Sequence, residues 1–290
     1  MKSRFDLGAA RKIARFCREN GIDIVHTHYL RENYIAMLSK LFYAKPRVVY
    51  TNHILLENNL ITRISNRILS LLQYRVIAVC TPGKTQMIAN GIPGRLIEVI
   101  YNGIDPKLWA CDRQQEHESL TFIYAARVVE GKGHETLLNA VAMIKDKPFK
   151  VVIAGDGALL DSMRELAERL ELGDKVTFTG FCKDIKPLLA AADVYSSPSA
   201  QEALSMSLLE AMAAGLPLIA TDIAGNPEIL ATGSGIQVPC GDARAFADAM
   251  LKMLENPELR EKYRQAALAA ANGTFNVSTM LSKTKEAYGG

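Results

Sequence analysis

Short apolar runs alternate with helical patterns along most of the chain, and the arrangement occurs twice. In the first part the predicted strands are 22–26, 48–51, 76–80 and 97–101. Helical periodicity separates them, at 7–20, 33–42, 61–73 and 83–90. The second part has six predicted strands, at 120–125, 150–154, 175–179, 193–196, 216–221 and 235–238. Strands that alternate with helices form parallel sheets through right-handed crossovers. The sequence therefore predicts an α/β protein with two doubly wound, Rossmann-like domains.

The 290 residues also favour two domains, since a domain usually has about 100 to 200 residues. The polar segment CDRQQEHES, 111–119, is the best linker. We therefore expect an N-terminal domain over 1–117, a second domain over 118–273, and a C-terminal helix in 274–290 that packs back toward the first domain. The first domain has four predicted strands against six, and the chain opens directly on a helical pattern. We accordingly expect the first domain to be truncated.

Composition excludes several classes of protein. Hydrophobic residues make up 49% and charged residues 22%, which is typical of a folded globular chain and not of a disordered one. No apolar run approaches the ~18 residues of a membrane span, and residues 1–21 carry charges where a signal peptide is apolar. The five cysteines are scattered and form no C-x-x-C pair. These features predict a cytoplasmic protein with reduced thiols.

Charge is distributed unevenly along the chain. Residues 1–110 hold 16 Lys and Arg against seven Asp and Glu, a net charge of +9, whereas residues 111–290 hold 18 against 24, a net charge of −6. Arg11, Arg15 and Arg18 share one helix face, and Arg63 and Arg67 repeat the i, i+4 spacing. An anionic membrane surface is therefore a candidate partner, with a solvated basic surface as the alternative. Nucleic acid is not expected, because no aromatic residues are interleaved with these cations.

Two cations mark a predicted strand-to-helix turn in the second half. In AARVVEGKGHETLLNA, Arg127 follows a strand and Lys132 lies between glycines just before a helix. Free N–H groups and the helix dipole at such a turn favour an anion, so this segment is a candidate phosphate site. The alternative is a pair of surface cations.

Two carboxylates lie around a later predicted helix start. The stretch SPSAQEALSMSLLEAMAAGLPLIATD carries Glu202 and Glu210 around a start at Ser205 or Ser207. Glu202 is then expected in the entering loop and Glu210 on the helix. The alternative for Glu210 is a capping box with Ser207, in which the glutamate only closes the helix end. The alternative for Glu202 is an exposed loop carboxylate.

Taken together, these segments resemble the retaining, nucleotide-sugar-dependent glycosyltransferases of family 4, which have the GT-B fold. The resemblance rests on the order and spacing of IDIVHTH, VVYTNH, VIYNGID, YAARVVEGKG, VVIAGDG, VTFTGF, AADVYSSPS, the E-x7-E stretch and AAGLPLIATDIAGNPEIL. Family members begin with a strand and a glycine-rich loop, and nothing before Asp23 corresponds to them. The resemblance therefore implies a complete donor half and an incomplete acceptor half.

The resemblance also assigns roles to individual residues. It implies that Arg127 and Lys132 hold the donor diphosphate, Glu202 the donor sugar and Glu210 the ribose hydroxyls. It implies that His53, in VVYTNH, faces the reaction centre, whereas the alternative is a satisfied histidine at a strand end. Backbone N–H groups would add donor contacts from Ala203, Leu204, Ser205 and Met206. Position 203 is usually glycine in the family and is alanine here.

The expected chemistry needs no metal and no cofactor. The chain contains no D-x-D triplet, so Arg127 and Lys132 would stabilise the departing diphosphate in place of a metal. His26 and His28 alternate on a strand, but no further ligand cluster accompanies them. The resemblance implies a hexosyltransferase with a nucleotide-diphosphate sugar as donor, UDP-sugar being the commonest kind, and a carbohydrate or glycolipid as acceptor.

Two other functions stay open at the level of sequence. GDGALL begins like the dinucleotide fingerprint G-x-G-x-x-G, which would suit a nicotinamide-dependent oxidoreductase, but Leu160 stands at the third glycine position. The other function is a non-catalytic remnant of a transferase that still binds a nucleotide or a partner. The retained Arg127, Lys132, Glu202 and Glu210 argue against such decay of the donor site.

Overall fold

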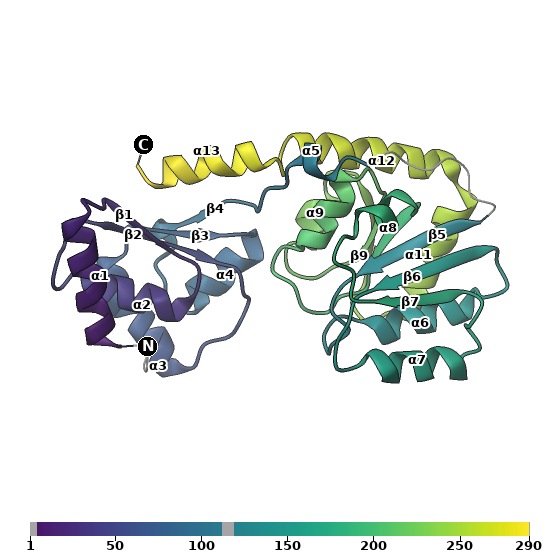
Figure 1. Ribbon diagram of the computed structural model, residues 1–290, viewed down its shortest axis with the longest axis horizontal. Helices are drawn as coiled ribbons and strands as arrows, with labels where there is room; N and C mark the ends of the chain where they lie inside the picture. Colours follow the sequence, from purple (N-terminus) through teal and green to yellow (C-terminus); the bar gives the residue numbers. More distant parts are fainter. Residues whose placement is uncertain (1–4, 112–118, 290) are drawn as a thin grey trace. The chain divides into compact units, whose positions relative to one another are not determined.

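The computed structural model describes residues 5–111 and 119–289. They form two compact units: unit 1 comprises Met1–Asn102 and Met280–Gly290, and unit 2 comprises Gly103–Thr279. Figure 1 shows each unit as a parallel sheet with helices packed against it. Most of the predicted linker, at 112–118, lies outside the described residues.

Unit 1 is built on a four-stranded parallel sheet in the order β1-β2-β3-β4. The register pairs Val48 with Val25 and Tyr50 with Val76. The strands are β1 (Ile24–Thr27), β2 (Arg47–Asn52), β3 (Arg75–Ala78) and β4 (Ile97–Val99). The helices are α1 (Leu7–Glu19), α2 (Leu30–Ser39), α3 (Leu60–Leu69), η1 (Ser70–Leu72), α4 (Thr81–Ala89), η2 (Gly94–Leu96) and α13 (Val277–Ala287), of which α13 continues from unit 2.

Alternation of side chains along β2 divides the core of unit 1 between the two faces of the sheet. Val49 packs with Ala287 of α13 on one face. Tyr50 packs with Met87 of α4 on the other, where Val48 also meets Met37 of α2. The sheet is thus covered on both sides, which explains why its strands read as nearly continuous apolar runs.

Unit 2 is built on a six-stranded parallel sheet in the order β10-β9-β8-β5-β6-β7. Its strands are β5 (Leu120–Ala125), β6 (Phe149–Ala154), β7 (Val176–Gly180), β8 (Val194–Ser197), β9 (Leu218–Thr221) and β10 (Gly235–Val238). Its helices are α5 (Pro106–Trp109), α6 (His134–Met143), α7 (Leu160–Arg169), α8 (Lys186–Ala190), α9 (Met206–Ala213), α10 (Asn226–Leu230), α11 (Ala243–Glu255) and α12 (Pro257–Asn272). α6 packs against α7 and α11, whereas α9 packs against α5 and α12.

The strand order of unit 2 determines where a ligand can bind. The chain runs from β5 outward to β7, and then crosses back to β8 on the other side of β5 before running to β10. β5 and β8 are therefore neighbours at a topological switch point, and the helices that follow them, α6 and α9, pack against different helices. Ligands of open α/β sheets bind at such a switch point, at the carboxyl ends of the strands.

The sequence-based fold class is confirmed, and the differences concern boundaries. Residues 103–111 were expected in the first domain but belong to unit 2, because α5 packs against α9 and α12. Every predicted strand is present within about two residues of its expected position. The helix expected over 33–42 begins three residues earlier, at Leu30, directly after β1. The helix expected over 61–73 is divided, since α3 ends at Leu69 and a short 3-10 turn follows.

Candidate active site

An ion pair joins the loops that follow β5 and β8. The Lys132 ammonium lies 2.6 Å from the Glu202 carboxylate, and both side chains are mostly buried, with 20% and 17% of their surfaces exposed. Ser199 donates a second hydrogen bond, of 3.1 Å, to the same carboxylate oxygen. Sequence analysis singled out Lys132 and Glu202 separately, and the switch point brings them together.

Glycines allow the two loops to approach this closely. Gly133 has φ +70°, and a Cβ there would lie 2.0 Å from the Pro198 carbonyl oxygen. Gly131 accepts a 2.8 Å hydrogen bond from the Ala200 N–H. Lys132 is therefore held between two glycines whose backbones pack directly against the neighbouring loop.

The start of α6 adds a second electrostatic feature. His134, the first residue of α6, is buried, and its ring centroid lies 4.9 Å from that of Tyr124. Burial, and then the charge of Lys132, lower the pKa of His134 to about 4. The imidazole is therefore neutral at pH 7, so the positive potential here comes from Lys132 and the helix N-terminus.

Arg127 lies on the same loop but has an exposed side chain. The loop is positioned by the turn after β6, because a Cβ on Gly155 would lie 1.9 Å from the Ala126 carbonyl oxygen. Gly157 approaches Val128 in the same way, since a Cβ on Gly157 would lie 2.3 Å from the Val128 carbonyl oxygen. The glycines of GDGALL thus serve loop packing, which removes the need for a dinucleotide to explain them.

Glu210 lies on α9 and is half-buried. The capping-box alternative is wrong, because the N-cap of α9 is Ser205, so that Ser207 lies inside the helix and its hydroxyl is 3.1 Å from that of Ser205. Burial raises the pKa of Glu210 to about 7. This carboxyl therefore exchanges its proton near neutral pH, a property suited to hydrogen bonding with hydroxyls in either direction.

The segment between Glu202 and Glu210 presents backbone N–H groups. Ala203, Leu204 and Ser205 are buried, whereas Met206 is 41% exposed. The Ala203 carbonyl accepts a 2.8 Å hydrogen bond from Gly225, which fixes this segment against the start of α10. The first N–H groups of a helix have no partner within the helix, so the start of α9 favours an anion.

In unit 1 the structure places His53 in a cluster of three histidines. His53 follows β2, and its Nε2 lies 3.0 Å from Nδ1 of His28. The His28 ring stacks on that of His26 at 4.6 Å, and His26 Nδ1 lies 2.7 Å from the Tyr288 hydroxyl of the C-terminal segment. The alternation of His26 and His28 along a strand is visible in the sequence. The contact of His28 with His53 and that of His26 with Tyr288 are not, because they join residues far apart in the chain.

Burial lowers the pKa values of two of these histidines. The pKa of His26 falls to about 4, mainly by burial and then by the charges of His28 and His53. The pKa of His53 is lowered by burial first and by His28 second. Both rings therefore favour the neutral form at pH 7. Within residues 5–111 and 119–289, no group of three or more His, Cys, Asp or Glu side chains is placed to hold a metal ion.

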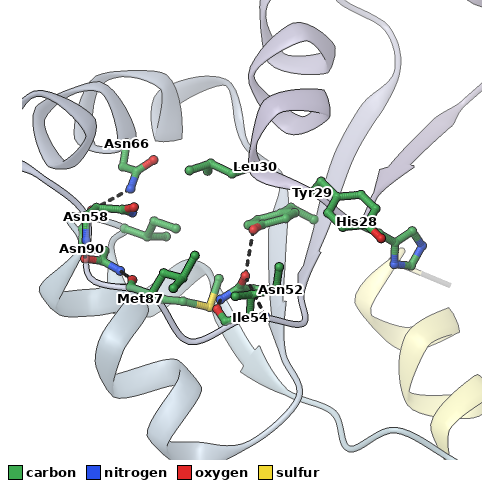
Figure 2. A pocket seen from close by; sticks show the side chains of 12 residues that line it. His28, Tyr29, Leu30, Asn52, Ile54, Asn58, Asn66, Met87 and Asn90 are labelled. Carbon is green, nitrogen blue, oxygen red and sulfur yellow. Dashed lines mark hydrogen bonds between the residues drawn. The ribbon is translucent and has the colours of Figure 1, made fainter. Parts of the chain in front are cut away.

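Figure 2 shows a pocket in unit 1 at the carboxyl ends of β1 and β2. It has a volume of about 100 Å³ and mixes apolar with amide side chains, among them Tyr29, Ile54 and Met87. Asn90 fixes its rim, since its side chain donates to the Leu56 carbonyl at 2.8 Å and accepts from the Asn58 N–H at 2.9 Å.

Comparison with known families agrees with this geometry. The model of glycosyl transferases group 1 matches residues 111–269, which include the Lys132 and Glu202 loops. The model of glycosyltransferase family 4 matches residues 1–108. The chain belongs to the group 1, family 4 glycosyltransferases.

Curated relatives of this chain include bacterial glycosyltransferases. The glycosyltransferase EpsD of Bacillus subtilis is 38% identical over 151 residues, which are 51% of this chain and 40% of EpsD. An N-acetylgalactosaminyltransferase of Campylobacter jejuni, named for a diphospho-undecaprenol substrate, is 27% identical over 278 residues, 90% of this chain and 75% of the relative. The chain thus spans less than half of EpsD and three quarters of the second relative.

Solved structures share the fold of this glycosyltransferase. A glycosyltransferase from Rickettsia africae has a TM-score of 0.89 at 22% identity. The match covers 97% of this chain and 80% of the Rickettsia chain. Anabaena HepE in complex with UDP-glucose has a TM-score of 0.80 at 24% identity and covers 96% and 80%. The GT-B architecture expected from sequence is therefore confirmed.

The nicotinamide-dependent alternative finds no support in these comparisons, since both family models are those of glycosyltransferases. In the described parts of the chain, no helix has the length and apolar character needed to cross a bilayer.

Proposed function

We propose that this glycosyltransferase moves a hexose from a UDP-sugar to an acceptor hydroxyl, with retention at the anomeric carbon and without a metal ion. The observation that carries the proposal is the Lys132–Glu202 ion pair at the switch point of unit 2. The pair would offer a cation to a diphosphate and, beside it, a carboxylate to sugar hydroxyls. It lies inside the segment that matches the group 1 family.

In this proposal the donor diphosphate lies over the loop after β5. Lys132 and Arg127 stabilise the charge that grows on the diphosphate as its bond to the sugar breaks, and the N-termini of α6 and α9 act in the same direction. The buried position of Lys132 strengthens its interaction with an anion, because less water screens it. A divalent metal is then not required for the leaving group.

The carboxylates and backbone groups would position the rest of the donor. Glu202, already oriented by Ser199, accepts hydrogen bonds from the sugar hydroxyls. Glu210 binds the ribose hydroxyls, and backbone N–H groups of Ala203 to Met206 contact sugar and phosphate. The uridine base is supported by solved relatives of the same fold whose crystals contain UDP or UDP-glucose.

Unit 1 would supply the acceptor side. His53, neutral because burial lowers its pKa, is the candidate to contact the reacting sugar. The pocket of Figure 2 has about 100 Å³, below the roughly 300 Å³ of a typical small-molecule site, so we assign to it one end of the acceptor. Relatives named for polysaccharide, lipopolysaccharide and lipid-linked substrates support a carbohydrate or glycolipid acceptor.

The test begins with the donor, because the donor does not require knowledge of the acceptor. Calorimetry with UDP, GDP and ADP, followed by release of nucleotide from UDP-glucose, UDP-N-acetylglucosamine and GDP-mannose, identifies the base and the sugar. Proton NMR of the product then reports whether the anomeric configuration is retained. We expect UDP to bind, and turnover to persist in excess EDTA.

Three outcomes of this test would count against the proposal. Loss of turnover in EDTA that Mg²⁺ or Mn²⁺ restores would contradict the metal-independent mechanism. An inverted product would contradict retention. Tight UDP binding without nucleotide release from any donor, with or without added oligosaccharide or glycolipid acceptors, would favour the non-catalytic remnant.

A further inference from the structure

Three histidine rings of unit 1 lie against one another, and we call them the histidine stack. His26 is on β1, and His28 follows two residues later on the same side of the strand. His53 comes directly after β2, the neighbour of β1 in the sheet. The ring centroids are 4.6 Å apart for His26 and His28, and 5.3 Å apart for His28 and His53. The planes differ by only 26° and 19°, so the rings lie nearly parallel.

The inner end of the histidine stack is held on two sides. His26 Nδ1 lies 2.7 Å from the Tyr288 hydroxyl, and His26 Nε2 lies 2.7 Å from the Thr51 hydroxyl. Because both nitrogens are bonded, this ring cannot turn without breaking a hydrogen bond. A neighbour that stacks on such a ring is restricted in its own plane. The plane of His28 is therefore set in part by His26.

The outer end of the histidine stack contains a hydrogen bond between two rings. Nδ1 of His28 lies 3.0 Å from Nε2 of His53. A neutral imidazole has one N–H donor and one bare nitrogen acceptor, so only one of these two facing nitrogens carries a hydrogen. If His28 donates from Nδ1, then His53 carries its own hydrogen on Nδ1. If His53 donates from Nε2, then His28 carries its hydrogen on Nε2. In both arrangements the two rings are the same tautomer.

The shared hydrogen also determines what the two rings offer to a ligand. Their remaining nitrogens are Nε2 of His28 and Nδ1 of His53. In either arrangement one of these is an N–H donor and the other is a bare acceptor. A sugar hydroxyl can both donate and accept, so such a pair suits neighbouring hydroxyls. His28 also lines the pocket of Figure 2, to which we assigned one end of the acceptor.

We propose that His28 is a positioning residue for His53: the hydrogen between them couples the tautomers of the two rings, and His26 and Tyr288 fix the plane of His28 from behind. The inference rests on the proposed function, in which His53 contacts the reacting sugar. The C-terminal segment then takes part in ordering the reaction centre, through the contact of Tyr288 with His26.

Nitrogen NMR of the whole chain tests the coupling without any substrate. Long-range ¹H–¹⁵N spectra distinguish the N–H from the bare nitrogen of each ring, and His28→Phe and His53→Phe assign the signals. At about pH 8, where an unperturbed histidine is neutral, we expect His28 and His53 to have the same major tautomer. We also expect the tautomer ratio of His53 to change in His28→Phe. Opposite tautomers in the wild type, or an unchanged ratio in His28→Phe, would overturn the proposal.

Amide replacements separate the hydrogen bond from packing. The His28 side chain is exposed, so its replacement leaves the core intact. The amide of Asn reaches the position of Nδ1, whereas that of Gln ends nearer the position of Nε2. We expect His28→Asn to keep kcat for sugar transfer within about threefold of the wild type, and His28→Gln and His28→Phe to lower it about tenfold. The KM for the donor should not change in any of the three variants.

A smaller effect is expected at the inner end of the histidine stack. Tyr288→Phe removes one of the two hydrogen bonds to His26, so we expect kcat to fall by about two- to fourfold. Tyr43→Phe, which changes another tyrosine of unit 1, is the matched control and should leave kcat unchanged.

Several kinetic results would overturn the proposal. One is the same kcat for His28→Asn and His28→Gln, and another is a loss in His28→Phe that appears only in the KM for the donor, because His28 would then act by packing. Equal losses in Tyr288→Phe and Tyr43→Phe would remove the role of the inner end. The proposed function fails separately: coupled tautomers in a wild-type protein that releases nucleotide from no donor would confirm the ring pair and refute transfer.

Discussion

The buried polar residues of the two units have different partners. In unit 2 the loops after β5 and β8 meet through glycine backbones, and the Lys132–Glu202 ion pair lies across them. In unit 1 the amides of Asn66 and Asn90 fasten α3 and the loop before it, while the apolar residues of α3 face outward. Unit 2 thus fixes a buried ion pair, and unit 1 fixes the orientation of a helix.

The two units also differ in how closely these segments are packed. The loops of unit 2 are packed backbone against backbone, so a side chain added at Gly133 must displace them. The outward side chains of α3 lie at the surface of unit 1, where a substitution meets fewer neighbours. The predictions below test this contrast.

The largest effect is expected where the loops of unit 2 touch. Gly133→Ala places a Cβ 2.0 Å from the Pro198 carbonyl oxygen at a positive φ, so both loops must shift. We expect the free energy of unfolding to fall by at least about 3 kcal/mol, measured by urea denaturation. Gly173→Ala, where a Cβ meets nothing within 4 Å, is the control. Similar costs at both positions would show that the loops are not packed as described.

Glu210 links stability in unit 2 to pH. Burial raises its pKa from 4.5 to about 7, so between these values the folded state holds a proton that the unfolded state has lost. This stabilising contribution is present below pH 4.5 and is lost as pH rises through 7. Glu210→Gln cannot ionise, so we expect it to gain up to about 3 kcal/mol relative to wild type by pH 8. Glu165→Gln, on the exposed side of α7, is the control and should follow the pH dependence of the wild type. If the free energy of unfolding of Glu210→Gln changed with pH in parallel with that of the wild type, the carboxyl would not be buried as described.

Lys132 is expected to matter for binding more than for folding. Lys132→Ala removes one charge-assisted contact to the diphosphate, worth about 1.5 to 3 kcal/mol, and should weaken UDP binding roughly ten- to hundredfold in calorimetry. The circular dichroism spectrum should not change. Lys252→Ala, on the exposed side of α11, is the matched control. Unchanged UDP affinity in Lys132→Ala would move the phosphate site away from the β5 loop.

The smallest effect is expected in unit 1. Asn66→Ala deletes the acceptor of the Tyr34 hydroxyl and the donor to the Asn90 carbonyl, at an expected cost of about 1 to 2 kcal/mol. Hydrogen exchange should accelerate in α3 and in residues 53–59. Ser65→Ala, on the same helix, loses only a bond to its own backbone and is the control. Faster exchange confined to unit 2 would refute the asparagine network as the element that orients α3.

Local sequence patterns were sufficient to predict most of the strands and helices of this protein. Apolar runs of strand length, separated by helical periods, predict both sheets, because a parallel strand must be buried on both faces and a crossover helix on one. The glycines around Lys132 and the serines before α9 likewise mark the two turns of the donor site. The donor-binding and catalytic roles stay predictions, since they depend on a bound donor; they concern Arg127, Lys132, Glu202, Glu210, His53 and the Ala203–Met206 segment.

Other features depend on residues far apart in the chain. Lys132 and Glu202 are 70 positions apart, and they meet because β8 returns to the side of β5. His28 and His53 meet because β1 and β2 are neighbours in the sheet. The capping-box alternative for Glu210 is excluded at this level, because helix α9 begins one residue after Ser205 and the carboxyl is half-buried.

The amino-acid sequence by itself determined the order of strands and helices, the position of the site loops and the uneven charge, since each follows from local periodicity, turn residues or composition. Only the tertiary structure decided which side of α3 faces out. Its pattern of isoleucines and polar residues predicts an amphipathic helix in either orientation, and burial of the apolar side would be the usual outcome. Tyr34 of α2 and Asn90, at the end of α4, supply the hydrogen bonds that make burial of the polar side favourable. Contacts between such distant residues carry no signal in a local pattern.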